Sequence, residues 1–250
     1  MKNVDLTSIK ANFDRDGYVA IPQFLDSAEL KNISESMVNF IQHQVPRMPA
    51  KYVFYEDNQD PSTLKQLQDI HVYDPSFESL LNGSKFEEIA SILLEDKVLG
   101  KNLEYFNKPP RIGKPTPAHQ DAYYFMLNPP KAITMWMALE EVDEENGCVR
   151  YIPGSHLTGM RPHGRTNTLG FSQGITDFGD EDFAKEIPVR AKPGDLLIHH
   201  AMTIHRADGN KSDRSRKALG FIYFGESAKE DVEAKKAYVQ RLSQERLQTT

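Results

Sequence analysis

The chain has 250 residues, of which 39% are hydrophobic and 26% are charged, and its formal net charge is −6. This composition is typical of a globular protein with a substantial core, and the lack of a basic stripe argues against a nucleic-acid partner. Every apolar run is much shorter than the roughly 18 residues of a membrane span. The polar N-terminus and the single cysteine, Cys148, lead us to expect a cytoplasmic protein with no membrane span. The oligomeric state stays open.

The first hundred residues are expected to be mostly helical. Residues 17–24 (GYVAIPQF) predict a strand at a sheet edge or a strand end, because a proline stands inside the run. Residues 26–42 predict an amphipathic helix, since Asp26 and Glu29 have the spacing of a capping box. Residues 84–96 predict a second amphipathic helix. The apolar stripe of the first helix consists of Leu30, Ile33, Met37, Phe40 and Ile41.

From residue 101 the pattern changes to short strands separated by Gly- and Pro-rich turns. The strand-like segments are 101–107, 132–142, 147–155, 186–191, 195–202 and 217–226. Side chains alternate between the two sides of a strand, so Thr134, Trp136 and Ala138 share one face. The opposite face carries Ile133, Met135, Met137 and Leu139. Many short strands of this kind are typical of a β sandwich or barrel.

The chain is therefore expected to form one mainly β domain with flanking helices (α+β) over residues 1–250. Within it we expect a mostly helical part at 1–100 and a β core at 101–225. A C-terminal helix is expected at 226–250, where the sequence is highly charged.

A candidate metal site lies in the segment TPAHQDAYYF (116–125). His119 and Asp121 are two residues apart, and on a strand such residues point to the same side. A third ligand would complete the two-histidine, one-carboxylate set that holds one face of an iron ion. Its candidates are His156, His163, His199, His200 and His205. The alternative is a hydrogen-bonded His–Asp pair in a turn, without a metal.

A longer series of motifs surrounds this pair, in the order FNKPP, HQD, W, NGC, PGSH, RPH, GD, H, N and RKA. In order and approximate spacing, the chain from about residue 64 to residue 224 resembles the phytanoyl-CoA dioxygenase family of iron(II)/2-oxoglutarate oxygenases. The resemblance implies a double-stranded β-helix, or jelly roll, which agrees with the predicted strands. It also implies Fe(II) as the metal, 2-oxoglutarate as a cosubstrate and O2.

The resemblance assigns roles to individual residues. His119, Asp121 and His205 match the iron ligands, and these three are the expected catalytic residues. Arg216 matches the arginine that pairs with the far carboxylate of 2-oxoglutarate, and Trp136 matches a residue beside that cosubstrate. A family lysine that also reaches 2-oxoglutarate falls near Gln66 or Lys65.

One departure from the family pattern is visible. Two residues after the distal histidine the human-type enzyme has a serine that bonds 2-oxoglutarate, whereas this chain has Ala207. Tyr105 and Thr134 are the candidates to replace that hydroxyl group. Related halogenases have a small residue where this chain has Asp121, so the resemblance implies hydroxylation rather than halogenation.

The expected activity is hydroxylation of an unactivated C–H bond in a small-molecule substrate, with conversion of 2-oxoglutarate to succinate and CO2. The substrate could be an acyl-CoA or a small metabolite. Basic loop residues favour an anionic substrate, unless they are simply solvated: Lys108, Arg111, Lys114, Arg161, His163, Arg165 and Arg206. The segments 46–63 and 160–174 are candidate lids.

An alternative function is a noncatalytic jelly-roll or cupin-like binding protein that keeps a metal without turnover. Arg216 discriminates against it, because a simple metal-binding module needs no buried arginine. Of the other histidines, His156 is expected to stabilise a turn. Only one of His199 and His200 can face the interior, and His200 is expected either near the metal ligands or as a core histidine.

Overall fold

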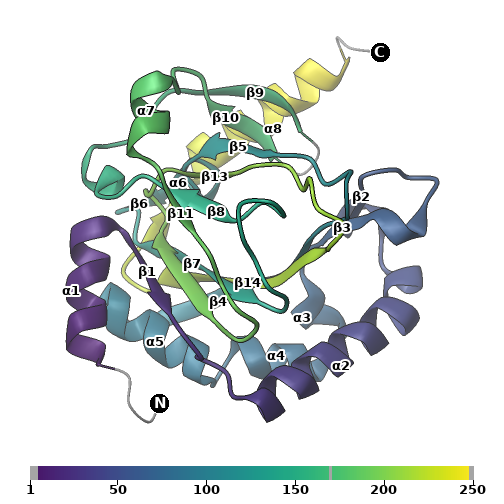
Figure 1. Ribbon diagram of the computed structural model, residues 1–250. Helices are drawn as coiled ribbons and strands as arrows, with labels where there is room; N and C mark the ends of the chain where they lie inside the picture. The colour runs from purple at the N-terminus through teal and green to yellow at the C-terminus, as the bar shows by residue number, and fades with distance from the viewer. Residues whose placement is uncertain (1–4, 169–170, 248–250) are drawn as a thin grey trace.

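The computed structural model describes residues 5–168 and 171–247, and its largest element is a seven-stranded sheet (Figure 1). From one edge to the other, this large sheet consists of β1 (Tyr18–Ile21), β12 (Leu196–His200), β7 (Ala132–Ala138), β14 (Arg216–Gly225), β4 (Val98–Lys108), β3 (Leu64–Leu67) and β2 (Val53–Tyr55). All neighbouring strands are antiparallel. The strand order differs from the chain order, as expected for a jelly roll.

A smaller four-stranded sheet faces the large one. Its strands are β11 (Ile187–Val189), β8 (Val149–Tyr151), β13 (His205–Ala207) and β5 (Thr116–His119). Side chains from both sheets share one buried cluster, in which Trp136 and Leu197 of the large sheet pack with Val149 and Tyr151 of the small one. Two hairpins complete the β structure: β9 (His163–Thr168) with β10 (Phe171–Ile175), and β6 (Leu127–Asn128) with β15 (Lys229–Glu230).

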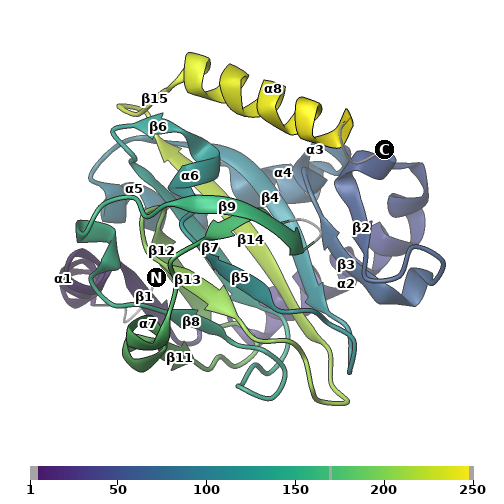
Figure 2. The ribbon, with the colours of Figure 1, turned by 90° about the horizontal axis from the view of Figure 1, so that it is seen from above.

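Helices cover the outer face of the large sheet, along its lower side in Figure 1. Most of the helices precede β4: α1 (Leu6–Asp16), α2 (Ser27–His43), α3 (Ile70–Tyr73), α4 (Pro75–Leu81) and α5 (Lys85–Leu94). The others are α6 (Ala122–Phe125), α7 (Asp180–Lys185) and α8 (Val232–Leu247), and α8 crosses the opposite side of the molecule above β6 and β15 (Figure 2). Short 3-10 turns lie at Val45–Arg47, Ala50–Tyr52, Pro61–Thr63 and Ser155–Leu157.

The expected local patterns explain these elements. Asp26 caps α2 by accepting hydrogen bonds from the backbone N–H groups of Ala28 and Glu29, and the Glu29 side chain returns a bond to the Asp26 N–H group. The predicted capping box is therefore confirmed. In β7, Met135 packs in the apolar core beneath the helices, whereas Trp136 packs between the sheets, so the predicted alternation is also confirmed.

Two features differ from the sequence expectations. The edge strand predicted within 17–24 is confirmed as β1, but the part expected to be mostly helical, 1–100, also supplies β2 and β3, so the large sheet extends across the expected division at residue 100. The polar N-terminal segment also forms α1, which Asp5 caps and Gly17 ends in a left-handed conformation. The strands depend on pairing with distant residues, such as that of β1 with β12, whereas the two ends of α1 are set by its neighbouring residues.

The two candidate lids have defined structure in part. Residues 46–63 contain short 3-10 turns and β2, whereas 160–174 includes the β9–β10 hairpin, whose residues 169–170 lie outside the described range. None of the helices among residues 5–168 and 171–247 has both the length and the apolar character needed to cross a bilayer.

Candidate metal centre and its cavity

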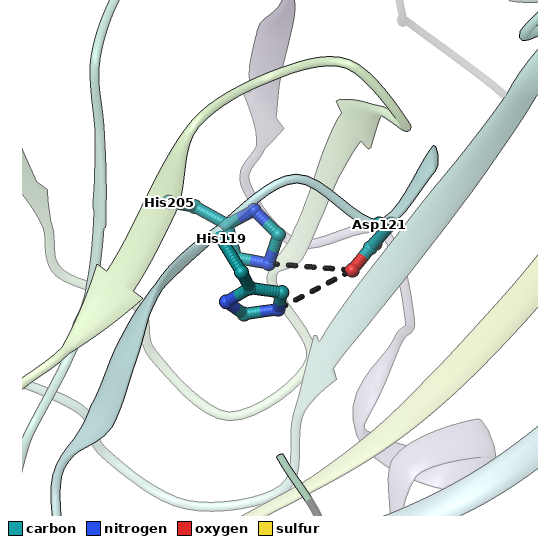
Figure 3. Close-up of side chains that lie close together, drawn as sticks. All are labelled: His119, Asp121 and His205. Carbon is teal, nitrogen blue, oxygen red and sulfur yellow. Dashed lines mark ion pairs between the residues drawn. The ribbon is translucent and has the colours of Figure 1, made fainter. Parts of the chain in front are cut away.

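Three of the predicted site residues converge at one point (Figure 3). His119 is the last residue of β5, and His205 is directly opposite it because β5 and β13 are paired. Asp121 is the residue before α6 and has a helical backbone conformation with no capping hydrogen bond from its side chain, so it lies beyond the end of β5 and the expected strand geometry of the His119–Asp121 pair is wrong. Its Oδ1 atom is 3.3 Å from His119 Nε2 and 3.8 Å from His205 Nε2. The ligand atoms all lie within 4.8 Å of one another, which suits a single metal ion.

The main chain orients both imidazoles. His119 Nδ1 is 2.8 Å from the carbonyl oxygen of Pro117, and His205 Nδ1 is 3.0 Å from that of Thr203. A carbonyl can only accept, so each Nδ1 carries the proton and each Nε2 presents its lone pair to the site. Burial, together with the neighbouring histidines, keeps the pKa of His205 well below its usual range. His205 is therefore neutral, as a metal ligand must be.

Side chains orient the carboxylate. Asp121 Oδ2 accepts a hydrogen bond of 2.6 Å from the Thr134 hydroxyl and lies 3.0 Å from His199 Nε2. Tyr151 contacts the other ring nitrogen of His199 at 3.1 Å. Burial would raise the pKa of Asp121, but the surrounding histidines outweigh it and hold that pKa well below its usual range. The remaining oxygen, Oδ1, faces the two histidine ligands.

Arg216 lies buried in the same cavity as these ligands. Its guanidinium is 5.0 Å from the centre of the Trp136 ring, and its Nε has no hydrogen-bond partner among the residues that the structure describes. Burial lowers the pKa of Arg216 to about 10, so the side chain remains cationic at neutral pH. A buried cation with an unused donor is suited to binding a carboxylate of a ligand.

Two lysines, Lys108 and Lys65, also line this part of the cavity. Lys108 faces Arg216 across the β4–β14 pair, and its amino group donates to the carbonyl oxygen of Lys114. Burial and the nearby Arg216 and Lys65 push the pKa of Lys108 well below its usual value. Lys65 is also buried, with its Nζ 3.3 Å from Glu56 Oε1. Both candidates for the family lysine, Lys65 and Gln66, line the cavity.

The cavity lies between the two sheets and has a volume of about 320 Å³. It brings together all but one of the predicted site residues: His119, Asp121, His205, Arg216, Trp136, Thr134 and Gln66. Tyr105 is the exception. It lies on the other face of β4, in the apolar core beneath the helices. Tyr105 therefore does not stand in for the hydroxyl group missing at Ala207, and the hydroxyl of Thr134 is bonded to Asp121.

The sequence did not single out His199 as the histidine that contacts Asp121. His199 faces the site, whereas His200 lies on the other face of β12, where its ring is 5.7 Å from that of His156 and 6.3 Å from that of Phe13. Of the two roles expected for His200, the structure thus shows the one away from the ligands. His199 pairs with Thr134 across β12 and β7, which is the register that could have identified it. His156 has the predicted turn position, with Nε2 3.1 Å from the Asp14 carbonyl oxygen.

Most of the basic loop residues have acidic partners. Arg111 contacts Asp213 at 2.5 Å, Arg161 contacts Asp182 at 2.9 Å, and Arg206 contacts both Glu186 and Asp208 at 2.6 Å. His163 accepts a hydrogen bond from the Gln120 backbone N–H group. These pairs neutralise the positive charge that favoured an anionic substrate.

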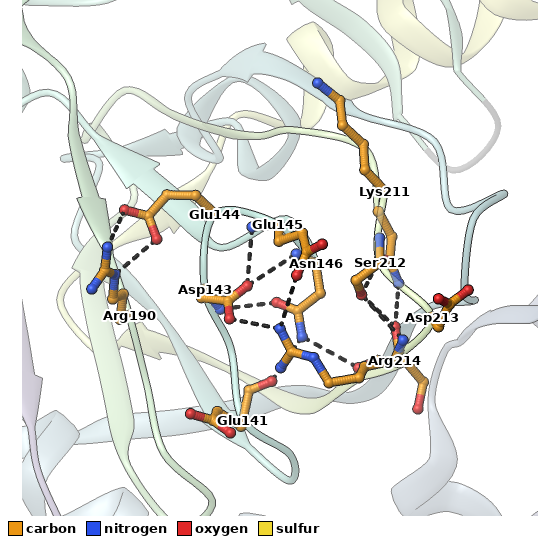
Figure 4. Close-up of polar contacts among 12 residues, drawn as sticks. Glu141, Asp143, Glu144, Glu145, Asn146, Arg190, Lys211, Ser212, Asp213 and Arg214 are labelled. Carbon is orange, nitrogen blue, oxygen red and sulfur yellow. Dashed lines mark hydrogen bonds and ion pairs between the residues drawn. The ribbon is translucent and has the colours of Figure 1, made fainter.

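The loops at 141–146 and 211–214 are joined by a polar network (Figure 4). Asn146 of the NGC motif accepts from the Asp143 N–H group at 2.9 Å and donates to the Glu141 carbonyl oxygen at 2.7 Å. Arg214 reaches Asp143 at 2.6 Å, which links the two loops. The NGC motif thus has a structural role here, and Asn146 is fully buried.

Proteins with related sequences match more than half of this chain. Phytanoyl-CoA dioxygenase domain-containing protein 1 from Bos taurus is 32% identical over 157 residues, which cover 61% of this chain and 54% of that protein. Phytanoyl-CoA dioxygenase 1 from Oryza sativa subsp. japonica is 26% identical over 240 residues, covering 83% of this chain and 84% of that protein. The match thus spans about half the length of the cattle protein and most of the rice protein.

Solved structures share the fold. EctD from S. alaskensis, with 2-oxoglutarate and 5-hydroxyectoine, has a TM-score of 0.72 at 20% identity and covers 90% of this chain and 78% of its own. The epimerase SnoN, with Fe3+, alpha ketoglutarate and nogalamycin RO, has a TM-score of 0.72 at 23% identity, and the match covers 89% of this chain and 84% of the SnoN chain. The carbocyclase SnoK from nogalamycin biosynthesis has a TM-score of 0.73 at 22% identity, and the match covers 96% of this chain and 91% of the SnoK chain.

These likenesses confirm the jelly-roll fold, and the sequence comparison places the chain more closely. The family model for phytanoyl-CoA dioxygenase (PhyH) matches residues 13–218, well over half of the chain. This protein belongs to the phytanoyl-CoA dioxygenase family.

Proposed function

We propose that this protein is an Fe(II)/2-oxoglutarate-dependent dioxygenase that hydroxylates an unactivated C–H bond of a small substrate. The observation that carries the proposal is that the His119–Asp121–His205 cluster and the buried Arg216 open into one cavity. Two imidazoles and one carboxylate suit Fe(II) and leave half of its coordination positions open. When bound, the iron together with 2-oxoglutarate and O2 would supply the oxidising power, and 2-oxoglutarate would become succinate and CO2.

The chain's own residues would bind and orient the cosubstrate. The guanidinium of Arg216 can make two parallel hydrogen bonds to the far carboxylate of 2-oxoglutarate. Trp136 supports that guanidinium from one side, at 5.0 Å. Burial lowers the pKa of both Lys108 and Lys65, and Lys65 is paired with Glu56, so these two line the cavity as hydrogen-bond donors and Arg216 supplies the positive charge for a dianionic ligand. Phe106 and Val149 form apolar walls that limit the access of water.

The cavity volume of about 320 Å³ sets the scale of the substrate. It admits 2-oxoglutarate with a small metabolite, or with the acyl end of an acyl-CoA whose remainder stays outside. The proposal does not rest on an anionic substrate, because Arg111, Arg161 and Arg206 are engaged with carboxylates.

A noncatalytic metal-binding jelly roll is the competing function. Such a protein would need the three ligands but not Arg216, whose burial without a carboxylate partner is costly. The fold also supports other outcomes of the same cofactor chemistry, since the neighbours include an epimerase and a carbocyclase. Product analysis is therefore part of the test.

The first experiment is an anaerobic titration with Fe(II) and 2-oxoglutarate, followed by the visible charge-transfer absorbance of the chelate. We expect the band in the wild-type protein, and we expect Arg216→Ala to need at least about 10-fold more 2-oxoglutarate, because a charge-assisted pair is lost. Arg214→Ala is the matched control, because Arg214 is partly exposed and pairs with Asp143 outside the cavity. Its titration should follow the wild type.

The possible results separate the two functions. A wild-type band followed by succinate release under O2 supports the oxygenase, and mass analysis of the organic product then distinguishes hydroxylation from epimerisation or ring closure. Metal binding without the 2-oxoglutarate band would contradict the proposal and favour the noncatalytic alternative. Equal titrations for Arg216→Ala and Arg214→Ala would remove the role given to Arg216.

A further inference from the structure

A buried carboxyl group lines the cavity away from the arginine. Trp136, Gly220 and Glu104 are register partners on β7, β14 and β4, so Glu104 lies two strands from Trp136 on the same face of the large sheet. The Glu104 side chain is only 6% exposed and faces the cavity. None of the described residues forms an ion pair with it. A carboxyl group buried in this way is rare without a partner of opposite charge.

Two amides hold Glu104 in place. Gln66 donates to Oε2 at 3.2 Å, and Asn102 donates to Oε1 at 2.8 Å. The orientation of the Asn102 amide is fixed from its other side, since its oxygen accepts from the Asp69 backbone N–H group at 2.9 Å. Burial raises the pKa of Glu104 to about 8, and the hydrogen bonds from Gln66 and Asn102 offset this effect only in part. The carboxyl group is therefore held in place, and no cation among the described residues is available to stabilise its ionised form.

The same wall carries a second unused acceptor. With its NH2 group directed to Glu104, the Gln66 side chain leaves Oε1 buried, and that atom has no hydrogen-bond partner among the described residues. Gln66 itself is 3% exposed and lines the cavity. A carboxyl group beside an amide oxygen that lacks a partner is suited to a ligand that carries hydrogen-bond donors.

This acceptor wall is separate from the cationic end. Along the cavity face of β4 the side chains follow the order Asn102, Glu104, Phe106, Lys108, so Phe106 separates Glu104 from Lys108 along the strand. The ring extends over Gly220, where a Cβ atom would lie 2.6 Å from it. Under the proposed function Arg216 binds the dianionic cosubstrate, and Glu104 lies on the part of the cavity left for the substrate.

We propose that Glu104, Gln66 and Asn102 form a substrate subsite that binds a protonated amine, so that the substrate is a small amine-bearing molecule. The inference rests on the proposed function for the assignment of the cationic end to 2-oxoglutarate. An ammonium group supplies both the cationic partner that the Glu104 carboxylate lacks and a hydrogen-bond donor for Gln66 Oε1. Binding it in the cavity would hold the C–H bonds of its carbon chain at a fixed position relative to Asp121.

The test compares three ligands with the same carbon chain, butylamine, butanol and butyrate, at neutral pH. Their binding is measured by the shift in melting temperature, both with Fe(II) and 2-oxoglutarate under anaerobic conditions and without them. We expect butylamine to bind more tightly than butanol under both conditions. With 2-oxoglutarate on Arg216 we expect butyrate to bind least, whereas without it Arg216 can bind butyrate, so butyrate is compared only in its presence. In Glu104→Gln the affinity for butylamine should fall by about 10- to 100-fold, while that for butanol changes little, since only a charge-assisted bond is lost.

Arg111→Gln is the matched control, because it removes a charge from an exposed ion pair outside the cavity. It should keep the wild-type preference for butylamine. Equal binding of the amine and the alcohol by the wild type, tighter binding of butyrate than of butylamine in the presence of 2-oxoglutarate, or an unchanged preference in Glu104→Gln would overturn the subsite. Failure of the charge-transfer band in the wild type would instead contradict the proposed function, and the measurements without iron would still report on the subsite.

Discussion

The two faces of the large sheet have the same strands but different chemistry. On the helix side, Met135 and Phe221 are fully buried in an apolar core. On the cavity side of the same strands, Thr134 bonds a metal-ligand carboxylate and Arg216 lies buried against Trp136. The alternation of side chains along a strand therefore separates the residues that stabilise the fold from those that perform the chemistry. Substitutions on the cavity side should therefore reduce activity more than stability, and substitutions on the helix side should reduce stability more than activity.

The largest effect is expected on the cavity side, from Asp121→Ala. Succinate formation should fall by more than the roughly 10- to 100-fold that follows loss of a residue merely supporting a ligand, because a ligand itself is removed. The free energy of unfolding should fall by only about 1–3 kcal/mol, since Thr134 and His199 each lose a partner. Urea unfolding and a succinate assay measure both quantities. Full turnover in this variant would show that Asp121 is not a ligand.

On the helix side, Phe221→Ala should cause a large loss of stability with little change in cosubstrate binding. Phe221 is fully buried and stacks on Phe86 at 4.1 Å, so its truncation should lower the free energy of unfolding by about 3–5 kcal/mol. At low temperature the surviving folded protein should bind 2-oxoglutarate as the wild type does. Val38→Ala, on the exposed side of α2, is the control and should change stability by less than about 0.5 kcal/mol. A large loss of cosubstrate affinity in folded Phe221→Ala would remove the separation between the faces.

A smaller effect should distinguish the adjacent histidines of β12. His199→Gln should weaken metal affinity by about 10- to 100-fold, because His199 orients Asp121. His200→Gln, one residue further on the opposite face, should leave metal affinity near the wild-type value. Metal titrations of the two variants measure the two affinities. Equal losses of metal affinity would mean that the distance of a histidine from the site, and not the strand face on which it lies, determines its effect.

The smallest effect concerns pH. The pKa of Glu104 is raised from 4.5 to about 8, so between these values the folded protein keeps a proton that the unfolded chain has lost. Stability due to this group is complete at low pH and declines as the pH rises towards 8. Relative to Glu104→Gln, the wild type should lose about 1 kcal/mol of unfolding free energy between pH 7 and pH 8. Chemical denaturation of both proteins at the two pH values measures this difference, and parallel pH profiles would contradict the raised pKa.

The sequence predicted the features that depend on local spacing or on ordered motifs. The capping box at Asp26, the two faces of β7 and the convergence of His119 with His205 all follow from patterns within short segments or from the family motifs. The C-terminal helix was also expected and forms α8.

The sequence did not predict features that depend on pairing between distant segments. Choosing His199 over His200 requires the β12–β7 register, and placing Tyr105 on the helix side requires the register of β4 with β14. The ion pair between Arg111 and Asp213 joins residues 102 positions apart, so the loop charge looked unbalanced in the sequence alone. Long-range partners decide both the face of a strand and the net charge around a loop.

The ways in which the metal ligands are oriented have a consequence for how the site tolerates random substitution. The imidazoles of His119 and His205 take their orientation from the carbonyl groups of Pro117 and Thr203, which any amino acid would supply at those positions. Asp121 instead depends on the side chains of Thr134 and His199. A single substitution at Thr134 or His199 can therefore remove a hydrogen bond that orients the Asp121 carboxylate. A substitution at position 117 or 203 keeps the carbonyl group that fixes the tautomer of the histidine ligand.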